Sequence, residues 1–359
     1  MENEIVSIKV VVVDDSAFMR KALSTMLEKD PEIKVVATAR NGEEGLELIR
    51  THQPDVVTLD IEMPKMDGLT ALRHIMMEMP RPVLMVSSLT TEGAESTLKA
   101  MELGAVDFIP KQLSKVSLDI VRIEESLRAK VKEVARRKFR APRALRPATA
   151  KQAAARAPQP AARPSGRLIR DVVAVGVSTG GPPAVQKMLS ALPADFPAGI
   201  LIAQHMPAAF TGPFAKRLDS VSQIRVKEAE GVEAFKPGTV YIAPGGKHLV
   251  LAQKGSRMEV QVVEEPANAL YKPSANVLIG STAEYFGRRT LGVILTGMGN
   301  DGLEGVRALK SRGGRAIAQN DASCVVFGMP KAIVDANLAD EVVDIDDMAQ
   351  AVMKNIYTH

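Results

Sequence analysis

The sequence predicts an α/β protein with two doubly wound parallel-sheet domains. We expect the first to be flavodoxin-like and the second to be a Rossmann-like, three-layer domain. In both halves of the chain, short apolar runs alternate with amphipathic, helix-like runs, which is typical of parallel sheets. Each apolar run also ends in polar or glycine residues, and ligands bind at these carboxyl ends in open α/β sheets.

The first domain is expected over residues 1–125. Its buried strands are predicted at 8–15, 54–62 and 82–89, and its first helices at 17–29 and 43–52. The second domain is expected over residues 169–359, with strands at 172–178, 199–207 and 290–298.

A basic segment separates the two domains. Between Arg136 and Arg170 there are eleven Lys/Arg and no Asp/Glu, and the segment is rich in Ala and Pro. We therefore interpret residues 126–168 as a linker. The whole chain has a net charge of +4, so the remainder without these eleven cations carries −7. Because the basic residues lie in the linker and Trp is absent, a nucleic-acid surface is not expected.

Composition also favours a cytoplasmic protein without membrane insertion. No run of eighteen apolar residues occurs, and the first residues lack the features of a signal peptide. The single cysteine, Cys324, excludes an intrachain disulfide and fits a reducing compartment. We expect Cys324 to be a small buried side chain.

Polar residues at the strand ends of the first domain form one acidic set. Asp14 and Asp15 end the first strand, Asp60 and Ser87 end two later strands, and Lys111 follows the run 106–110. A doubly wound sheet brings all of them to one edge. This combination suits phosphoryl transfer to a carboxylate, because carboxylates hold Mg²⁺ while a lysine and a hydroxyl bind phosphoryl oxygens.

Residues 8–125 therefore resemble the response-regulator receiver family. The resemblance implies that Asp60 is the phospho-acceptor and that Asp14, Asp15 and Asp60 bind Mg²⁺. It also implies phosphate contacts from Ser87 and Lys111, and a switch aromatic at Phe108. The chain departs from the family at Lys111, which is usually followed by proline but here is preceded by Pro110 and followed by Gln112.

The second domain carries Ser178 in the pattern Gly176-Val177-Ser178-Thr179-Gly180. This pattern alone fits a nucleophilic serine on a sharp turn or a glycine-rich phosphate cradle equally well. His205 ends the next strand, and Asp301 lies in the glycine-rich turn after the strand at 290–298. Because a nucleophilic serine needs a base and the base needs an orienting carboxylate, the three together favour a Ser-His-Asp hydrolase. We interpret His248 as a structural loop residue, with a place bordering the site as the alternative, and His52 and His74 as surface residues.

The runs VGVSTGGP, QHMP, LTGMGNDG and IAQNDASCVVFGMP, together with the receiver, resemble the CheB family of chemotaxis protein-glutamate methylesterases. The resemblance spans residues 170–355. It implies Ser178 as nucleophile, His205 as base and Asp301 as orienting acid. Thr179 and Met298 match positions near the family's active site, and the Met298 N–H is expected to be an oxyanion donor.

The resemblance also implies a function controlled by phosphorylation: hydrolysis of glutamyl methyl esters on chemotaxis receptors, with deamidation of particular receptor glutamines. Expected partners are these receptors and a chemotaxis histidine kinase as phosphodonor. Hydrolysis is expected to need no cofactor. Mg²⁺ is expected to be needed only for phosphorylation of the receiver. Two alternatives are a receiver with a transcriptional output domain and one with a nucleotide-binding module. The sequence has no basic folded surface for the first alternative and no phosphate-loop lysine for the second.

Overall fold

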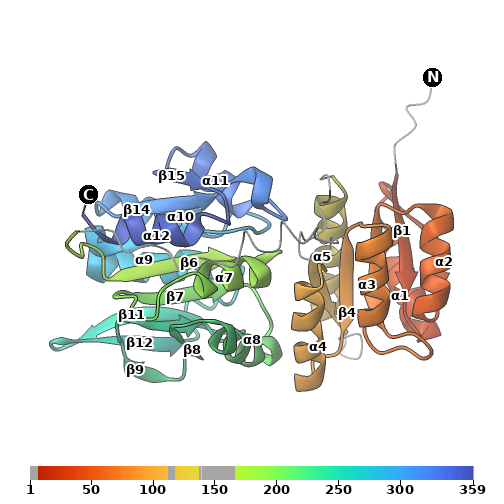
Figure 1. Ribbon diagram of the computed structural model, residues 1–359, viewed down its shortest axis with the longest axis horizontal. Helices are drawn as coiled ribbons and strands as arrows, with labels where there is room; N and C mark the ends of the chain where they lie inside the picture. Colours follow the sequence, from red (N-terminus) through yellow and green to blue (C-terminus); the bar gives the residue numbers. More distant parts are fainter. Residues whose placement is uncertain (1–6, 112–117, 137–138, 140–165, 359) are drawn as a thin grey trace, which may run out of the picture. The chain divides into compact units, whose positions relative to one another are not determined.

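The computed structural model describes residues 7–111, 118–136, 139 and 166–358 (Figure 1). The chain divides into two compact units, Met1–Ala155 and Arg156–His359. Residues 140–165, which make up most of the expected linker, lie outside the described residues. No helix among the described residues is long and apolar enough to cross a membrane.

The first unit contains a five-stranded parallel sheet in the order β2-β1-β3-β4-β5, which is the flavodoxin-like order. Every residue of β3 and β4 and the last four residues of β1 are buried, as expected for a sheet covered on both faces. The strands are β1 (Ile8–Val13), β2 (Ile33–Ala39), β3 (Val56–Asp60), β4 (Val83–Ser87) and β5 (Asp107–Pro110).

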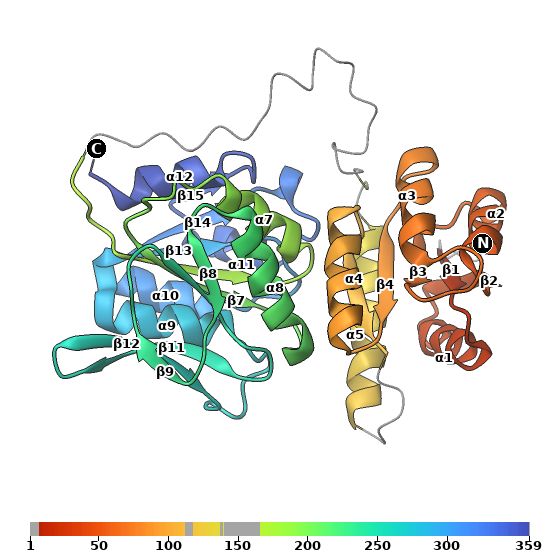
Figure 2. The same ribbon diagram turned by 60° about the horizontal axis from the view of Figure 1, so that its bottom comes forward.

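Among the described residues of this unit, five helices cover the sheet. Helices α1 and α5 contact each other. In a separate group, α3 lies between α2 and α4 (Figure 2). Helix α5 continues for ten residues past residue 125, where we expected the domain to end, and it buries Val131 and Val134. The helices are α1 (Ala17–Glu28), α2 (Gly42–His52), α3 (Gly68–Glu78), α4 (Thr91–Glu102) and α5 (Leu118–Ala135).

The second unit is built on a seven-stranded parallel sheet in the order β15-β14-β13-β6-β7-β10-β8. Every residue of the central strands β6, β13 and β7 is buried. The strands are β6 (Val172–Val177), β7 (Gly199–Gln204), β8 (Arg225–Glu228), β10 (Thr239–Ile242), β13 (Thr290–Ile294), β14 (Arg315–Gln319) and β15 (Glu341–Val343).

Two helical layers complete this unit, so the expected doubly wound, three-layer architecture is confirmed. One layer contains α9, α10 and α11, and the other contains α7, α8 and α12. Their bounds are α7 (Gly181–Ser190), α8 (Ala208–Val221), α9 (Ala275–Phe286), α10 (Leu303–Ser311), α11 (Met329–Asp335) and α12 (Met348–Ile356). Short 3₁₀ turns lie at Gly287–Arg289 and Asp321–Ser323.

A small antiparallel sheet in the order β11-β12-β9 was not predicted. Its strands are β9 (Val232–Ala234), β11 (His248–Lys254) and β12 (Arg257–Val263). Strand β11 packs on α9. Cys324 is only partly buried, contrary to expectation, because it follows a 3₁₀ turn in a loop and lies outside the apolar core.

Candidate active site and acidic cluster

The register of the central strands brings the predicted hydrolase residues to one edge of the second sheet. Val177 at the end of β6 pairs with Gln204 at the end of β7, and Gly176 pairs with Ile294 at the end of β13. The chain continues from β6 to β7 on one side, whereas β13 joins β6 on the other. The strand order therefore reverses beside β6, and crevices at such reversals are where open α/β sheets bind ligands.

Ser178 lies between β6 and α7. Its N–H donates to the Thr296 carbonyl at 3.0 Å, and its own carbonyl accepts from Gly181 N–H and from Gln204 Nε2. Gly180 caps α7 with φ of 75°, a left-handed conformation that favours glycine. These contacts fix the backbone of Ser178 at the start of a helix.

His205 and Asp301 form a close pair. His205 Nε2 lies 2.8 Å from Asp301 Oδ2, and both side chains are almost fully buried. His205 Nδ1 is also buried and has no hydrogen-bond partner within the described residues. Ser178 Oγ forms no hydrogen bond with the imidazole in the described part of the chain. Such bonds are often long in structures without substrate.

Asp301 is held by the start of α9. Ala275 N–H donates to Oδ2 at 2.7 Å, and Asn276 N–H and the Ser274 hydroxyl donate to Oδ1 at 3.0 and 2.9 Å. Burial opposes ionisation of Asp301, but the hydrogen bond and charge of His205 and these N–H groups hold its pKa below the usual range. Asp301 is therefore a carboxylate that accepts from the imidazole.

Thr179 and Met298 lie where the sequence places them, next to Ser178 and in the loop after β13. Thr179 is buried, and its carbonyl accepts from the Thr296 hydroxyl at 2.9 Å. Across the described residues, no hydrogen bond is found for the Met298 N–H. Gly297 packs against Ser178 so closely that a Cβ at this position would lie 2.8 Å from Ser178 Cβ.

The predicted acidic set also meets at one edge of the first sheet. Asp14 and Asp60 are buried, and Lys111 Nζ lies 2.6 Å from Asp60 Oδ2 and 3.2 Å from Asp14 Oδ2. These are close ion pairs, but neither Oδ2 accepts a well-directed hydrogen bond. Burial raises the pKa of Asp60 to about 6. Lys111 opposes this shift and the Asp14 carboxylate adds to it.

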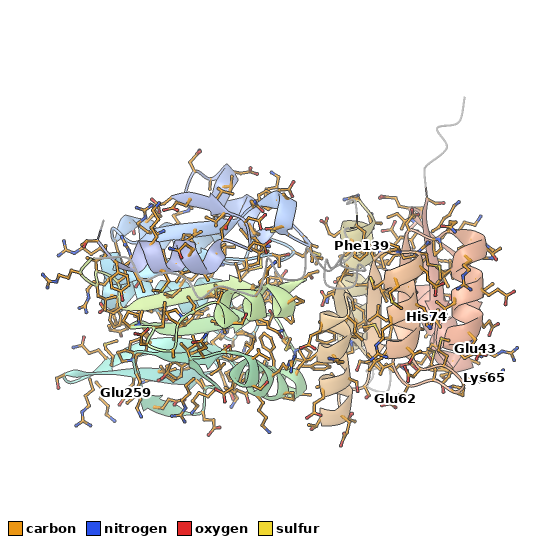
Figure 3. The ribbon with its side chains drawn as sticks, viewed as in Figure 1. Glu43, Glu62, Lys65, His74, Phe139 and Glu259 are labelled. Atoms are coloured by element: carbon orange, nitrogen blue, oxygen red, sulfur yellow. The ribbon has the colours of Figure 1, made fainter. Side chains whose placement is uncertain are left out.

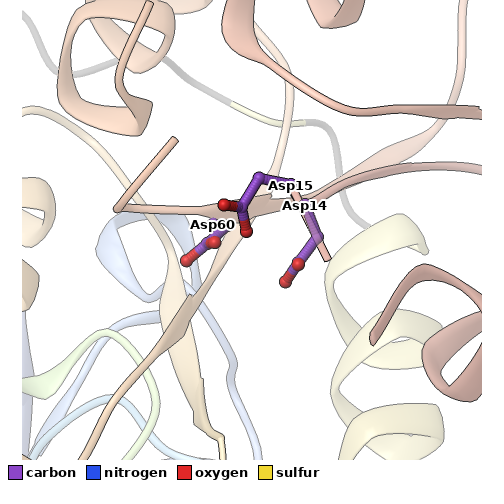
Figure 4. Close-up of side chains that lie close together, drawn as sticks. All are labelled: Asp14, Asp15 and Asp60. Carbon is purple, nitrogen blue, oxygen red and sulfur yellow. The ribbon is translucent and has the colours of Figure 1, made fainter. Parts of the chain in front are cut away.

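Asp15 completes a cluster of three carboxylates (Figure 4). One oxygen from each of Asp14, Asp15 and Asp60 lies within 4.8 Å of the others, and Asp15 is exposed. Glu62 and Lys65, on the loop that follows Asp60, are also exposed (Figure 3). The cluster therefore lies at the surface of the first unit.

Ser87 lies at the same strand edge, but its hydroxyl bonds elsewhere. It accepts from Thr97 Oγ1 at 2.7 Å and donates to the Gly93 carbonyl, both in α4. Its backbone carbonyl accepts from Lys111 N–H. Phe108 is buried, and Lys130 Nζ lies 5.7 Å from the centre of its ring.

Both halves of the chain match known families. Residues 10–121 match the response regulator receiver domain, and residues 173–352 match the CheB methylesterase family. A "Protein-glutamate methylesterase/protein-glutamine glutaminase 2" of Nitratidesulfovibrio vulgaris is 73% identical to this chain, covering 98% of it and 100% of the relative. The chain belongs to the CheB methylesterase family.

More distant comparisons agree. A protein-glutamate methylesterase/protein-glutamine glutaminase of Pyrococcus abyssi is 44% identical, with 97% of this chain and 94% of the relative covered. The crystal structure of the Thermotoga maritima CheB methylesterase catalytic domain is 39% identical, with a TM-score of 0.50, and covers 52% of this chain and 98% of that one. The predicted receiver-linked methylesterase is confirmed, and the transcriptional and nucleotide-binding alternatives are not favoured.

Sequence reasoning missed three residues around the candidate triad. Tyr271 stacks on His205, with ring centroids 4.2 Å apart and an angle of 11° between the planes. Gln204 holds the Ser178 carbonyl, and Ser274 holds Asp301. Gln204 could have been found as the strand-end neighbour of His205, and Ser274 as the N-cap of a helix. Tyr271 lies in an irregular segment and leaves no periodic signal.

Proposed function

We propose that this protein hydrolyses glutamyl methyl esters on chemotaxis receptors, with Ser178 as nucleophile, His205 as base and Asp301 as the orienting acid. The single observation that carries this proposal is the His205–Asp301 contact through Nε2. With Nε2–H donating to the carboxylate, Nδ1 is the ring nitrogen left to accept a proton. No cofactor is required for this chemistry.

The reaction follows from these roles. Nδ1 of His205 takes the Ser178 hydroxyl proton as Oγ attacks the γ-carbonyl carbon of the ester. The Met298 N–H stabilises the oxyanion, a contribution worth about 10²–10³-fold per donor. The tetrahedral intermediate collapses and methanol leaves with the proton from His205. Water then releases the glutamate by the same steps. A receptor glutamine would react through the same acyl-enzyme, losing ammonia in place of methanol.

The receiver would control this activity through Asp60. A chemotaxis histidine kinase is the expected phosphodonor in the cytoplasm, and Asp60 the acceptor. Mg²⁺ prefers oxygen ligands, and three carboxylates could supply them here. Asp14 Oδ2 and Asp60 Oδ2 are buried, and the exposed Asp15 lies beside them. Bound Mg²⁺ would neutralise charge on the phosphodonor. Lys111 would pair with the phosphoryl oxygens, and Ser87 would contact them once its hydroxyl turns from α4.

Methanol release from methylated receptor membranes tests the hydrolase assignment. Ser178→Ala should abolish release, whereas the exposed Ser220→Ala on α8 should leave it unchanged. A fluorophosphonate probe, which labels only an activated serine, should label wild type and Ser220→Ala but not Ser178→Ala. Substantial methanol release by a folded Ser178→Ala protein would mean that the nucleophile lies elsewhere.

A further inference from the structure

His248 is a fully buried histidine outside the proposed triad. It is the first residue of β11 and has no exposed surface. Its Nε2 lies 3.3 Å from the Pro266 carbonyl, and its Nδ1 accepts from the Ser274 N–H at 3.3 Å. One imidazole therefore bridges the two ends of the segment 264–274, which joins β12 to α9.

These two partners fix the state of the ring. The Pro266 carbonyl can only accept, so Nε2 must carry a proton. The Ser274 N–H can only donate, so Nδ1 must be unprotonated. The bridge thus requires the neutral Nε2–H tautomer. Burial and the Lys272 charge lower the pKa of His248; the Pro266 hydrogen bond and the charges of Asp301 and Glu265 oppose this effect.

The bridged segment carries two residues that contact the candidate His205–Asp301 pair. Its Tyr271 stacks on the His205 ring, and its Ser274 donates a hydroxyl to Asp301 Oδ1 at 2.9 Å. Other contacts also hold the segment: Gly246 N–H donates to the Lys272 carbonyl, Lys272 Nζ donates to the Glu264 carbonyl, and Lys247 Nζ lies 4.0 Å from Glu264 Oε1. A loss of the His248 bridge would remove the contact on the Ser274 backbone and loosen the segment that carries Tyr271.

We propose that His248 is a positioning residue for ester hydrolysis: its neutral imidazole holds Tyr271 against His205 and Ser274 against Asp301. This role rests on the proposed function. His248 does not touch the reacting atoms, so it should affect the rate of acylation more than the binding of the receptor. Misplacing a catalytic group by about 1 Å can cost on the order of 10²-fold in rate.

The test compares His248→Phe with His248→Gln in the full-length protein. Phenylalanine keeps a flat ring but makes neither hydrogen bond, whereas the glutamine amide offers one donor and one acceptor. We expect His248→Phe to lower kcat for methanol release by about 10–100-fold, with KM within about twofold. His248→Gln should recover most of kcat.

Ser281→Ala is the matched control. Its hydroxyl accepts from Leu251 N–H and so ties β11 to α9 without touching the bridged segment. Its kcat should stay within about twofold of wild type. If His248→Phe and Ser281→Ala lose kcat equally, general destabilisation explains the loss, and the proposal is overturned.

A measurement on the wild-type protein covers the case in which His248→Phe does not fold. Long-range ¹H–¹⁵N correlation spectra should show His248 as the neutral Nε2–H tautomer at pH 7. A charged ring or an Nδ1–H tautomer would overturn the bridge. Normal kcat in His248→Phe beside an inactive Ser178→Ala would refute the positioning role alone. An active Ser178→Ala would refute the proposed function instead.

Discussion

His205 meets Asp301 through Nε2, at 2.8 Å, and not through Nδ1. In the chymotrypsin type of triad the carboxylate contacts Nδ1 and the serine uses Nε2. In the proposed triad the two ring nitrogens therefore exchange roles: Nε2 meets Asp301, which is anchored at the start of α9, and Nδ1 is left for the serine. A candidate triad is therefore recognised by the order of contacts from serine to histidine to aspartate, and not by which imidazole nitrogen makes each contact.

Asp301→Asn should lower kcat by about 10³–10⁴-fold, less than Ser178→Ala, because the nucleophile remains. It should also lower stability by about 1–3 kcal/mol, since an amide N–H₂ would face the N–H groups of Ala275 or Asn276. Methanol release and thermal unfolding measure the two effects. The exposed Asp335→Asn, in α11, serves as control and should change neither. Wild-type kcat in Asp301→Asn would exclude an orienting role.

Asp60→Asn should abolish Mg²⁺-dependent labelling of the protein by a phosphodonor such as an autophosphorylated histidine kinase. The exposed Glu62→Gln, on the following loop, should retain labelling. Addition of EDTA should stop labelling of wild type, because the carboxylates of Asp14, Asp15 and Asp60 would lose the metal. Persistent label on Asp60→Asn would place the acceptor elsewhere.

The burial of Asp60 should make the stability of the first unit depend on pH. The folded-state pKa of about 6 lies above the ordinary aspartate value of 3.8, so the folded state binds more protons between these two pH values. The contribution of Asp60 to the free energy of unfolding is therefore complete below pH 3.8 and is lost as the pH rises through 6.

Asp60→Asn should remove this dependence. The gain in unfolding free energy over wild type should be larger at pH 7.5 than at pH 5 by about 1–2 kcal/mol. Hydrogen exchange of the buried β3 amides, corrected for the intrinsic rate at each pH, measures it in the whole chain. If the gain in unfolding free energy is equal at both pH values, burial does not raise the pKa of Asp60.

Much of the fold follows from local patterns. The runs that became β6, β7 and β13 are uniformly apolar because both faces of the sheet are covered, and their polar ends locate the site. The sheet β11-β12-β9 was missed because its strands mix polar and apolar residues, and because β9 pairs with a strand more than 20 residues further along the chain. Pairing of that kind depends on tertiary packing against α9.

The same limit applies to the site. Ser178, His205 and Asp301 could be predicted because each follows a recognisable strand. The contact of Tyr271 with His205 could not, because Tyr271 lies in an irregular segment. The contacts of His248 with Pro266 and Ser274 could not either, because they form only when β11 meets that segment in the folded chain. Ser87 was found at the expected strand end, but no sequence pattern predicts that its hydroxyl bonds to α4.

Gly297→Ala should damage the active site because of the close approach of Gly297 to Ser178. An added Cβ would lie 2.4 Å from Met329 Sδ, 2.8 Å from Ser178 Cβ and 3.0 Å from Ser178 N. The methionine side chain can move, but the Ser178 backbone is held by Thr296 and Gln204, so the serine itself must shift. We expect kcat to fall by about 10–100-fold and stability by about 1–3 kcal/mol.

Gly280→Ala is the matched control for this substitution. Gly280 lies inside α9 with no atom within 4 Å of an added Cβ, so alanine should stabilise the helix by about 0.5–1 kcal/mol and leave kcat unchanged. Methanol release and thermal unfolding of both variants separate a local shift of Ser178 from a general loss of stability. If Gly297→Ala keeps full activity, the position of Ser178 is less tightly fixed than its contacts imply.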